Sequence, residues 1–305
     1  MVQTTTINVA YLGNMQSASA MTAAIHQGYF AKEHLVVHPV EFQTGPLEVN
    51  AMNAGSIQFL SVGPGIMYLP MKGQGKYLFS DAISLTDSVV ASKSAGITTL
   101  ADLKGQKVLV PLGSTGELIL LETLQKAGLQ LSDVHMINTS PAEQPSAFLS
   151  GSANVMAGWA PITTQILNKD PNAAVLASDK NFYPSTAFPV NWAVDNKYAQ
   201  SNPSVVSRFV RAMERGATYR TQHLTQVATW VASLSKVPLP LIQESEHQTV
   251  WFTGSKIAAN YKSGAVARWM TRYNQLYIQE GILTGTVPLS KYSLASVAES
   301  ARKGS

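Results

Sequence analysis

The feature that most constrains the fold is an alternation of strand-like and helix-like segments along the first 190 residues. Short β-branched and aliphatic runs are followed by stretches with helical periodicity. This order predicts an α/β protein with mostly parallel sheets. We expect strands at 7–11, 36–42, 57–62, 77–85, 88–92, 108–110, 134–138 and 155–157, and helices over 18–31 and 46–53.

Several helices are expected to begin at a proline, because its fixed φ and missing N–H suit the first helical position. These prolines are Pro46, Pro64, Pro141, Pro161 and Pro203. After Val194 the pattern becomes helical, with candidate helices over 203–221, 222–234, 240–250 and 262–281. A long helical tail usually packs back onto a lobe. The whole chain therefore indicates two α/β lobes with a cleft between them, the first lobe completed by the C-terminal part.

The turns that lead from a strand into a helix are the first candidate ligand contacts. In α/β sheets these turns meet at the carboxyl edge of the strands, where ligands bind. Asn14 and Gln16, after the first strand, offer amide hydrogen bonds, although loop amides are more often solvated. The later turns add three candidates: Gly45, Gly63 and Pro64.

The stretch "VLVPLGSTGELILL" (108–121) holds the turn Gly113–Gly116 between a strand and a helix. Free N–H groups and the helix dipole favour an anion there, and the hydroxyls of Ser114 and Thr115 can add hydrogen bonds. The lysine of a nucleotide-binding loop is missing. The alternative is an ordinary capping box in which Ser114 caps the helix and Glu117 reaches back, placing a charge that would repel an anion. The residues alone leave both interpretations open.

Aromatic and acidic residues near the expected crossings between the lobes are further candidates. Trp159, in the turn "GWAP", either walls a small-ligand pocket or packs the turn onto the core. Phe188, Asn191 and Trp192 lie where the chain is expected to cross back between the lobes. Asp87 lies at the other crossing, where a carboxylate either holds a ligand cation or caps a turn.

Composition and motifs exclude several other classes of protein. The net charge is +4 with lysine and arginine scattered, which argues against nucleic acid as a partner. The six histidines show no spacing typical of zinc sites, and the chain has no cysteine, so no metal and no cofactor are expected. No G-x-S-x-G elbow marks a nucleophile, and we expect no catalytic residue. Binding is the function that remains.

The chain resembles the periplasmic substrate-binding proteins of ABC importers, in the nitrate/sulfonate/taurine group. The segments that carry the resemblance include "AAIHQGYFAKEHL" (23–35) and "LADLKGQKVLV" (100–110), followed by the Gly-Ser helix start and the "GWAP" turn. The resemblance implies a two-lobed periplasmic binding protein type II fold with the ligand in the interlobe cleft. It places lobe one at residues 1–88 plus 191–305 and lobe two at 89–190.

The resemblance also implies a function. A monomeric protein would capture a small organic anion, a sulfonate or a carboxylate, by lobe closure and deliver it to a membrane permease without doing chemistry. The anion would be held at Gly113–Gly116 beside Trp159. Val190 stands where taurine binders carry one of two acids, while Asp87 falls where that group also has an acid, so the match to taurine itself is incomplete. Phe188 and Trp192 suit a more apolar, aromatic ligand.

Two alternative functions on this fold are disfavoured. An enzyme of pyrimidine-precursor biosynthesis would need a site rich in His or Cys, and a ligand-sensing domain of a regulator would need a DNA-binding segment. The resemblance places the protein in the periplasm, or outside the cell on a lipid anchor. No apolar stretch approaches the ~20 residues that span a bilayer. Met1–Gln3 lead directly into a strand-like segment, so we expect that the sequence carries no signal peptide.

Overall fold

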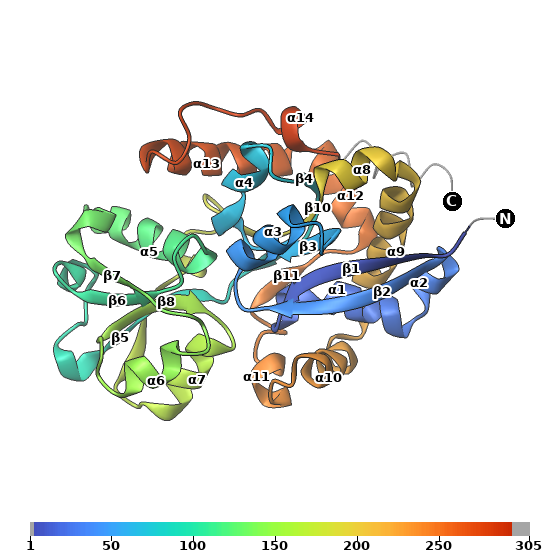
Figure 1. Ribbon diagram of the computed structural model, residues 1–305. Helices are drawn as coiled ribbons and strands as arrows, with labels where there is room; N and C mark the ends of the chain where they lie inside the picture. The colour runs from blue at the N-terminus through green and yellow to red at the C-terminus, as the bar shows by residue number, and fades with distance from the viewer. Residues whose placement is uncertain (1–2, 295–305) are drawn as a thin grey trace.

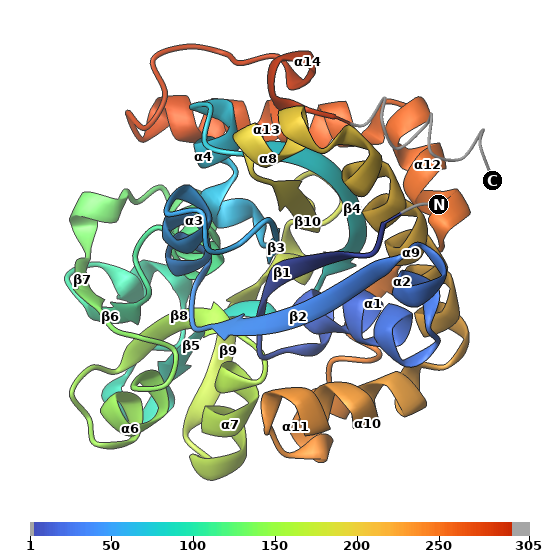
Figure 2. The same cartoon turned by 45° about the vertical axis from the view of Figure 1, so that its right-hand side comes forward.

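The computed structural model describes residues 3–294 and has two α/β lobes, each built on its own sheet (Figures 1 and 2). Residues 1–2 and 295–305, which belong to the predicted lobe one, lie outside the described residues. No helix within residues 3–294 is long and apolar enough to cross a membrane.

The sheet of the first lobe has six strands in the order β11-β4-β10-β3-β1-β2. Its strands are β1 (Thr5–Leu12), β2 (Leu35–Phe42), β3 (Phe59–Val62), β4 (Lys76–Ser84), β10 (Phe188–Val194) and β11 (Thr249–Trp251). The sheet of the second lobe has five strands in the order β7-β6-β8-β5-β9. They are β5 (Asp87–Ser92), β6 (Lys107–Val110), β7 (His135–Asn138), β8 (Val155–Trp159) and β9 (Ala173–Ser178).

Helices cover both sheets, and most of the C-terminal ones pack on the first lobe (Figure 1). Those before the second crossing are α1 (Met15–His26), α2 (Tyr29–Lys32), α3 (Gly45–Asn53), η1 (Pro64–Ile66), α4 (Tyr68–Met71), α5 (Thr115–Lys126), α6 (Gln144–Leu149), α7 (Ile162–Lys169) and the 3-10 turn η5 (Asp179–Asn181). Those after it are α8 (Asn196–Ser201), α9 (Pro203–Gln222), α10 (Leu224–Ser235), α11 (Leu239–Gln243), α12 (Gly254–Lys262), α13 (Ala265–Gln279) and α14 (Leu289–Tyr292).

The expectation of mostly parallel sheets is wrong. β1 pairs in parallel with β2 and β3, and β6 with β7 and β8. The pairs made by β5, β10 and β11 are antiparallel. β5 and β10 begin where the chain passes between the lobes, so they run against the strands that they join. Each sheet is therefore mixed, with a parallel half that carries the strand-to-helix turns.

Several predicted boundaries are corrected by local capping. The helix expected over 18–31 begins at Met15, because Asn14 Oδ1 accepts the N–H of Ser17 at 2.8 Å. It ends at His26, and Gly28, at φ +67°, separates it from α2. The helix expected over 262–281 begins at Ala265, because Gly264 at φ +73° separates it from α12, and it ends at Gln279.

Other segments were predicted in the wrong conformation or not at all. The helix expected over 240–250 ends at Gln243, and residues 249–251 form β11 on the edge of β4 instead. The helix expected from Pro141 begins at Gln144, and the strand expected at 57–62 begins at Phe59. Strands β9 and β10 were not expected. Tertiary pairing decides such short apolar runs, which periodicity alone cannot assign.

The chain changes sheets between Ser84 and Asp87, and again between Ser178 and Phe188. The predicted lobe boundaries, 88/89 and 190/191, fall a few residues beyond these crossings and stay a prediction. β4 ends and β5 begins at the first crossing, and β10 begins at the second. These three strand ends therefore meet between the lobes. The candidate site lies at this meeting point.

Candidate functional site

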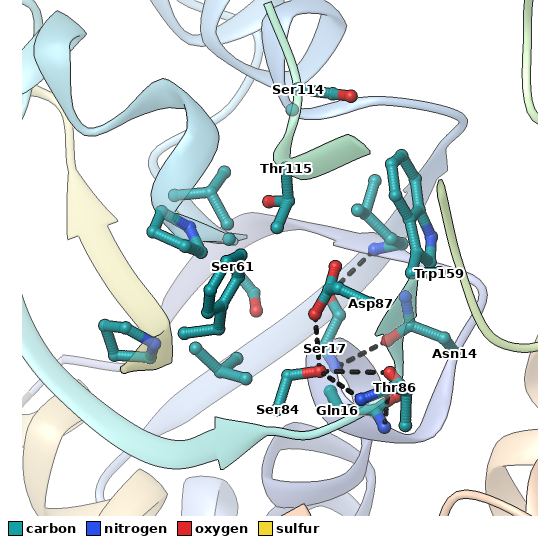
Figure 3. A pocket seen from close by; sticks show the side chains of 18 of the residues that line it. Asn14, Gln16, Ser17, Ser61, Ser84, Thr86, Asp87, Ser114, Thr115 and Trp159 are labelled. Carbon is teal, nitrogen blue, oxygen red and sulfur yellow. Dashed lines mark hydrogen bonds between the residues drawn. The ribbon is translucent and has the colours of Figure 1, made fainter. Parts of the chain in front are cut away.

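A pocket lies between the two sheets, with side chains from both lobes in its wall (Figure 3). Its cavity volume is ≈ 50 Å³, which leaves room for only a few water molecules. The lining residues are Leu12, Asn14, Gln16, Ser17, Gly45, Ser61, Val62, Gly63, Pro64, Ile66, Ser84, Thr86, Asp87, Ser114, Thr115, Trp159, Phe188, Pro189 and Val190.

Most of the candidates chosen from the sequence come together in this pocket. They are Asn14, Gln16, Gly45, Gly63, Pro64, Asp87, Ser114, Thr115, Trp159 and Phe188. The strand-to-helix turns supply most of them, as the carboxyl-edge argument predicts. Figure 3 shows Trp159 of the second lobe and Asn14 of the first on the same side of the pocket, Ser61 of the first lobe across from them, and Asp87 between.

Four candidates do not line the pocket. Gly113 and Gly116 belong to the turn, but their neighbours are Pro46, Tyr68 and the backbone of β8. Asn191 is fully buried. Its side chain accepts a hydrogen bond from Ser80 Oγ and donates one to the carbonyl oxygen of Pro189. Trp192 is fully buried beside Phe79 and Phe209.

A β-bulge explains why Phe188 and Trp192 separate. Along a regular strand residues 188, 190 and 192 would share a face. The pairing of β10 with β4 shifts between Val190 and Asn191 and again between Trp192 and Ala193, with the extra residues on β4, and such irregularities bend and twist the sheet locally. Phe188 and Val190 therefore face the pocket, while Trp192 packs into the core. An aromatic ligand contact from Trp192 is not supported.

The N-terminus of α5 forms one wall of the pocket. Ser114 is the N-cap: its hydroxyl donates to the carbonyl oxygen of Pro111 and accepts the N–H of Gly116 at 3.1 Å. Glu117 turns back, and its Oε2 accepts the N–H of Gly113 at 2.6 Å. Within residues 3–294 the N–H groups of Ser114 and Thr115 have no hydrogen-bond partner. The cap and the open amides therefore coexist, and Glu117 does not line the pocket.

The turn of lobe one that carries η1 closes directly over this helix end. A Cβ on Gly63 would overlap the hydroxyl of Thr115, and a Cβ on Gly65 would overlap the Ser114 carbonyl group and the Thr115 nitrogen. The Gly65 N–H donates to Thr115 Oγ1 at 3.4 Å. Glycine is required here because the two backbones meet without space for a side chain. The lobes are thus in contact across the cleft.

Sequence reasoning missed several polar lining residues. Ser61 is fully buried, and its hydroxyl has no hydrogen-bond partner among the described residues. A buried hydroxyl without a partner is costly, so it marks a place where a ligand can bond. Ser84 and Thr86 hydrogen-bond to each other at 3.0 Å. Nothing in their sequence context separates these hydroxyls from ordinary strand residues.

The floor of the pocket holds amides and a carboxylate. Asn14 Oδ1 is used as a helix cap, while Gln16 Nε2 donates to Thr249 Oγ1 at 3.0 Å. Asp87 is buried, and its Oδ2 accepts from Ser84 Oγ at 2.7 Å. Burial raises the pKa of Asp87 to about 6, although the Ser84 hydrogen bond lowers it.

The arrangement can hold a small molecule with an anionic end. The pocket is lined by the open helix end with Ser114 and Thr115, by the apolar side chains of Trp159, Phe188 and Ile66, and by the carboxyl group of Asp87. Among the described residues no three His, Cys, Asp or Glu side chains gather as metal ligands. Two lobes joined by two crossings, with a pocket between them, define the class of two-lobed solute-binding folds.

The comparisons agree with this class. The structure of an alkanesulfonate-binding protein from Xanthomonas axonopodis pv. citri bound to MOPS superposes with a TM-score of 0.72 at 19% identity, covering 96% of this chain and 99% of that one. A Candida albicans protein described as having the generic periplasmic binding protein fold superposes with a TM-score of 0.74 at 15% identity, covering 95% and 96%. The fold expected from the sequence is confirmed.

The chain belongs to the NMT1/THI5-like family, whose model matches residues 15–226. A Brucella abortus protein named only as a binding protein is 28% identical over 95% of this chain and 90% of its own length. An Escherichia coli aliphatic sulfonates-binding protein is 28% identical over 67% and 63%. The resemblance stated from the sequence is confirmed.

Proteins named for functions other than binding also occur among the similar proteins. A Haemophilus influenzae protein named for thiamine biosynthesis is 24% identical over 90% of this chain and 87% of its own length. The structure of a desulfurization enzyme superposes with a TM-score of 0.72 at 14% identity, covering 98% and 99%. The fold alone therefore does not decide between binding and catalysis.

Proposed function

We propose that the protein is the solute-binding component of an ABC importer and captures a small organic anion, a sulfonate or a carboxylate, between its lobes. The observation that carries the proposal is the N-terminus of α5, where Ser114 and Thr115 line the pocket with unpaired N–H groups. Helix N-termini with open amides bind anions. The unpaired hydroxyl of Ser61 adds a donor from the opposite lobe.

Lobe closure is the proposed mechanism. The ligand contacts both lobes only when they are together, so it stabilises the closed form by its differential affinity. The small cavity and the contact of Gly65 with α5 mean that an organic anion enters only after the lobes separate. The closed protein, acting as a monomer in the periplasm or on a lipid anchor outside the cell, would then deliver the anion to the permease.

The enzyme alternative lacks a chemical group to carry it. The chain has no cysteine, and no histidine of the described residues lines the pocket. Asp87 is the titratable side chain in the wall, and it is bonded to Ser84 rather than to a partner that would activate a nucleophile. Binding without chemistry fits these groups better.

Thermal unfolding with a panel of small solutes tests the proposal. Propane-1-sulfonate, benzenesulfonate, benzoate and nitrate represent anions, with choline and glucose as cationic and neutral controls. At about a hundredfold excess over Kd, at least one organic anion is expected to raise the unfolding temperature by roughly 3 °C or more. A response to choline or glucose with none to any anion would contradict the assignment of the anion end.

Replacing Trp159 with alanine is expected to weaken binding of the responding anion by more than about tenfold, because the indole forms the wall beside Ser114 and Thr115. Calorimetric titration measures the affinity. Trp230, which is stacked on His26 and does not line the pocket, gives the matched control Trp230→Ala, which should leave affinity unchanged. Equal affinity in Trp159→Ala and the unmodified protein would assign the indole to packing alone.

A further inference from the structure

A second buried carboxyl lies behind Asp87, outside the pocket wall. Asp179, at the start of η5 just before the second crossing, is fully buried. Its Oδ2 accepts the backbone N–H of Asp87 at 3.1 Å, so the two buried aspartates lie side by side. Its Oδ1 has no donor among the described residues. A buried carboxyl oxygen that lacks a donor, on an aspartate next to a second buried aspartate, is a place for a proton.

The surroundings supply no cation to compensate two negative charges. Lys180 follows Asp179 but its Nζ donates to Gln248 Oε1 at 3.1 Å. On α13, Tyr273 donates to the carbonyl oxygen of Ala187, and Arg272 is paired with Glu122 at 3.0 Å. Ser84 is the neutral donor from β4. Within residues 3–294 no ion pair reaches either aspartate.

We propose that Asp87 and Asp179 act as one acid pair that holds a single proton on Asp179, so that Asp179 keeps Asp87 ionised towards the ligand. Two adjacent buried carboxylates cannot both ionise without a counter-charge, and the proton then belongs to the pair. Asp179 is a positioning residue, since it touches Asp87 and not the pocket. This inference rests on the proposed anion-binding function and specifies the charge that the ligand meets on the floor.

The energetics agree with the geometry. Burial raises the pKa of Asp179 far above its ordinary value, and the charge of Asp87 raises it further. Burial raises the pKa of Asp87 less, because it accepts hydrogen bonds from Ser84 and from Asp179. At neutral pH the floor therefore carries one negative charge. Because burial raises the pKa of Asp87, this carboxylate also takes a proton in mild acid, and the floor becomes neutral.

The charge on the floor has a consequence for specificity. A simple sulfonate places its anion in the same small pocket as ionised Asp87, whereas an aminosulfonate brings its own ammonium group. Taurine should therefore bind more tightly than propane-1-sulfonate, which has the same number of chain atoms, by about tenfold at pH 8. At pH 5 this preference should shrink towards one, because protonated Asp87 no longer attracts the ammonium group or repels the anion.

Infrared spectroscopy tests the pair without any ligand. The protein at pH 7 should show the carbonyl band of a protonated carboxyl, and Asp179→Asn should remove it. Glu48 is buried without partners and its pKa is raised by burial, so Glu48→Gln serves as a control that removes a different band. A spectrum without any protonated-carboxyl band, or one that Asp179→Asn leaves unchanged, overturns the inference. If Asp179→Asn does not fold, the spectrum of Glu48→Gln, which lacks the Glu48 band, gives the first outcome.

Calorimetric titration with taurine and propane-1-sulfonate at pH 5 and pH 8 completes the test. Asp179→Asn should keep the preference at both pH values within about twofold, because asparagine donates to Asp87 as protonated Asp179 does. A changed preference in that variant would mean that Asp179 is ionised, and would overturn the inference. If the infrared band is present but neither sulfonate binds, the proposed function is contradicted, while the acid pair of Asp87 and Asp179 is still supported.

Discussion

Replacing Gly65 with valine is expected to weaken the binding of an organic anion by roughly tenfold to hundredfold. The added side chain would overlap the carbonyl group of Ser114 and the nitrogen of Thr115. These are backbone atoms and cannot rotate away, so the lobes could not approach as they do here. In the proposed mechanism the ligand is held only between closed lobes, so every loss of closure is a loss of affinity.

The control for this variant is Gly285→Val. Gly285 has open space around its Cβ position and no left-handed φ, so valine there should change neither affinity nor stability. Gly65→Val should unfold at a temperature close to that of the unmodified protein, since its overlap is with the other lobe. Calorimetric titration gives the affinity and a thermal scan the stability. Unchanged affinity in Gly65→Val would show that the ligand is held with the lobes further apart.

Replacing Arg220 with methionine is expected to lower the free energy of unfolding by about 3–5 kcal/mol. Arg220 on α9 and Asp81 on β4 are both fully buried and form an ion pair at 2.7 Å. The guanidinium also donates to the carbonyl oxygens of Asp81 and Phe252 and lies over the ring of Trp251. Methionine would fill part of the space and leave the charge of Asp81 without compensation.

This loss should depend on pH. Burial raises the pKa of Asp81, and Arg220 holds it lower than burial alone would. Without Arg220 the pKa rises further, so Asp81 can take a proton in mild acid and lose its uncompensated charge. Urea unfolding should therefore show a smaller loss at pH 5 than at pH 8.

Arg215→Met is the matched control, on the same helix. Arg215 is 44% exposed and pairs with Glu33 at 3.3 Å, and Glu33 also has Arg211. Exposed pairs contribute about 0–1 kcal/mol, so this change should cost little. If Arg220→Met costs no more than Arg215→Met, the buried pair does not anchor α9 to the sheet.

The parts of the site that follow from local chemistry could be predicted from the sequence. A strand that stops at Pro111, a capping serine and an apolar helix define the start of α5, and its place at the carboxyl edge follows from the α/β order. Trp159 could be chosen for the same reason, since it ends β8 before α7. The sequence left open where the Glu117 side chain points. In the structure its Oε2 accepts a hydrogen bond from the N–H of Gly113, and this bond fixes its direction.

The parts that depend on contacts between distant segments could not be predicted. The bulge that turns Trp192 away arises from the pairing of β10 with β4, and no local pattern marks it. Asp179 meets Asp87 although 92 residues separate them. The close approach of Gly65 to Ser114 is likewise a contact between lobes.

The most direct test of the central claim is a crystal structure of the protein with bound propane-1-sulfonate. We predict that the sulfonate lies between the lobes, with its oxygens accepting hydrogen bonds from the N–H groups of Ser114 and Thr115 and its chain against Trp159. A sulfonate bound outside the cleft, or bound with its anionic group turned away from the N-terminus of α5, would contradict the account.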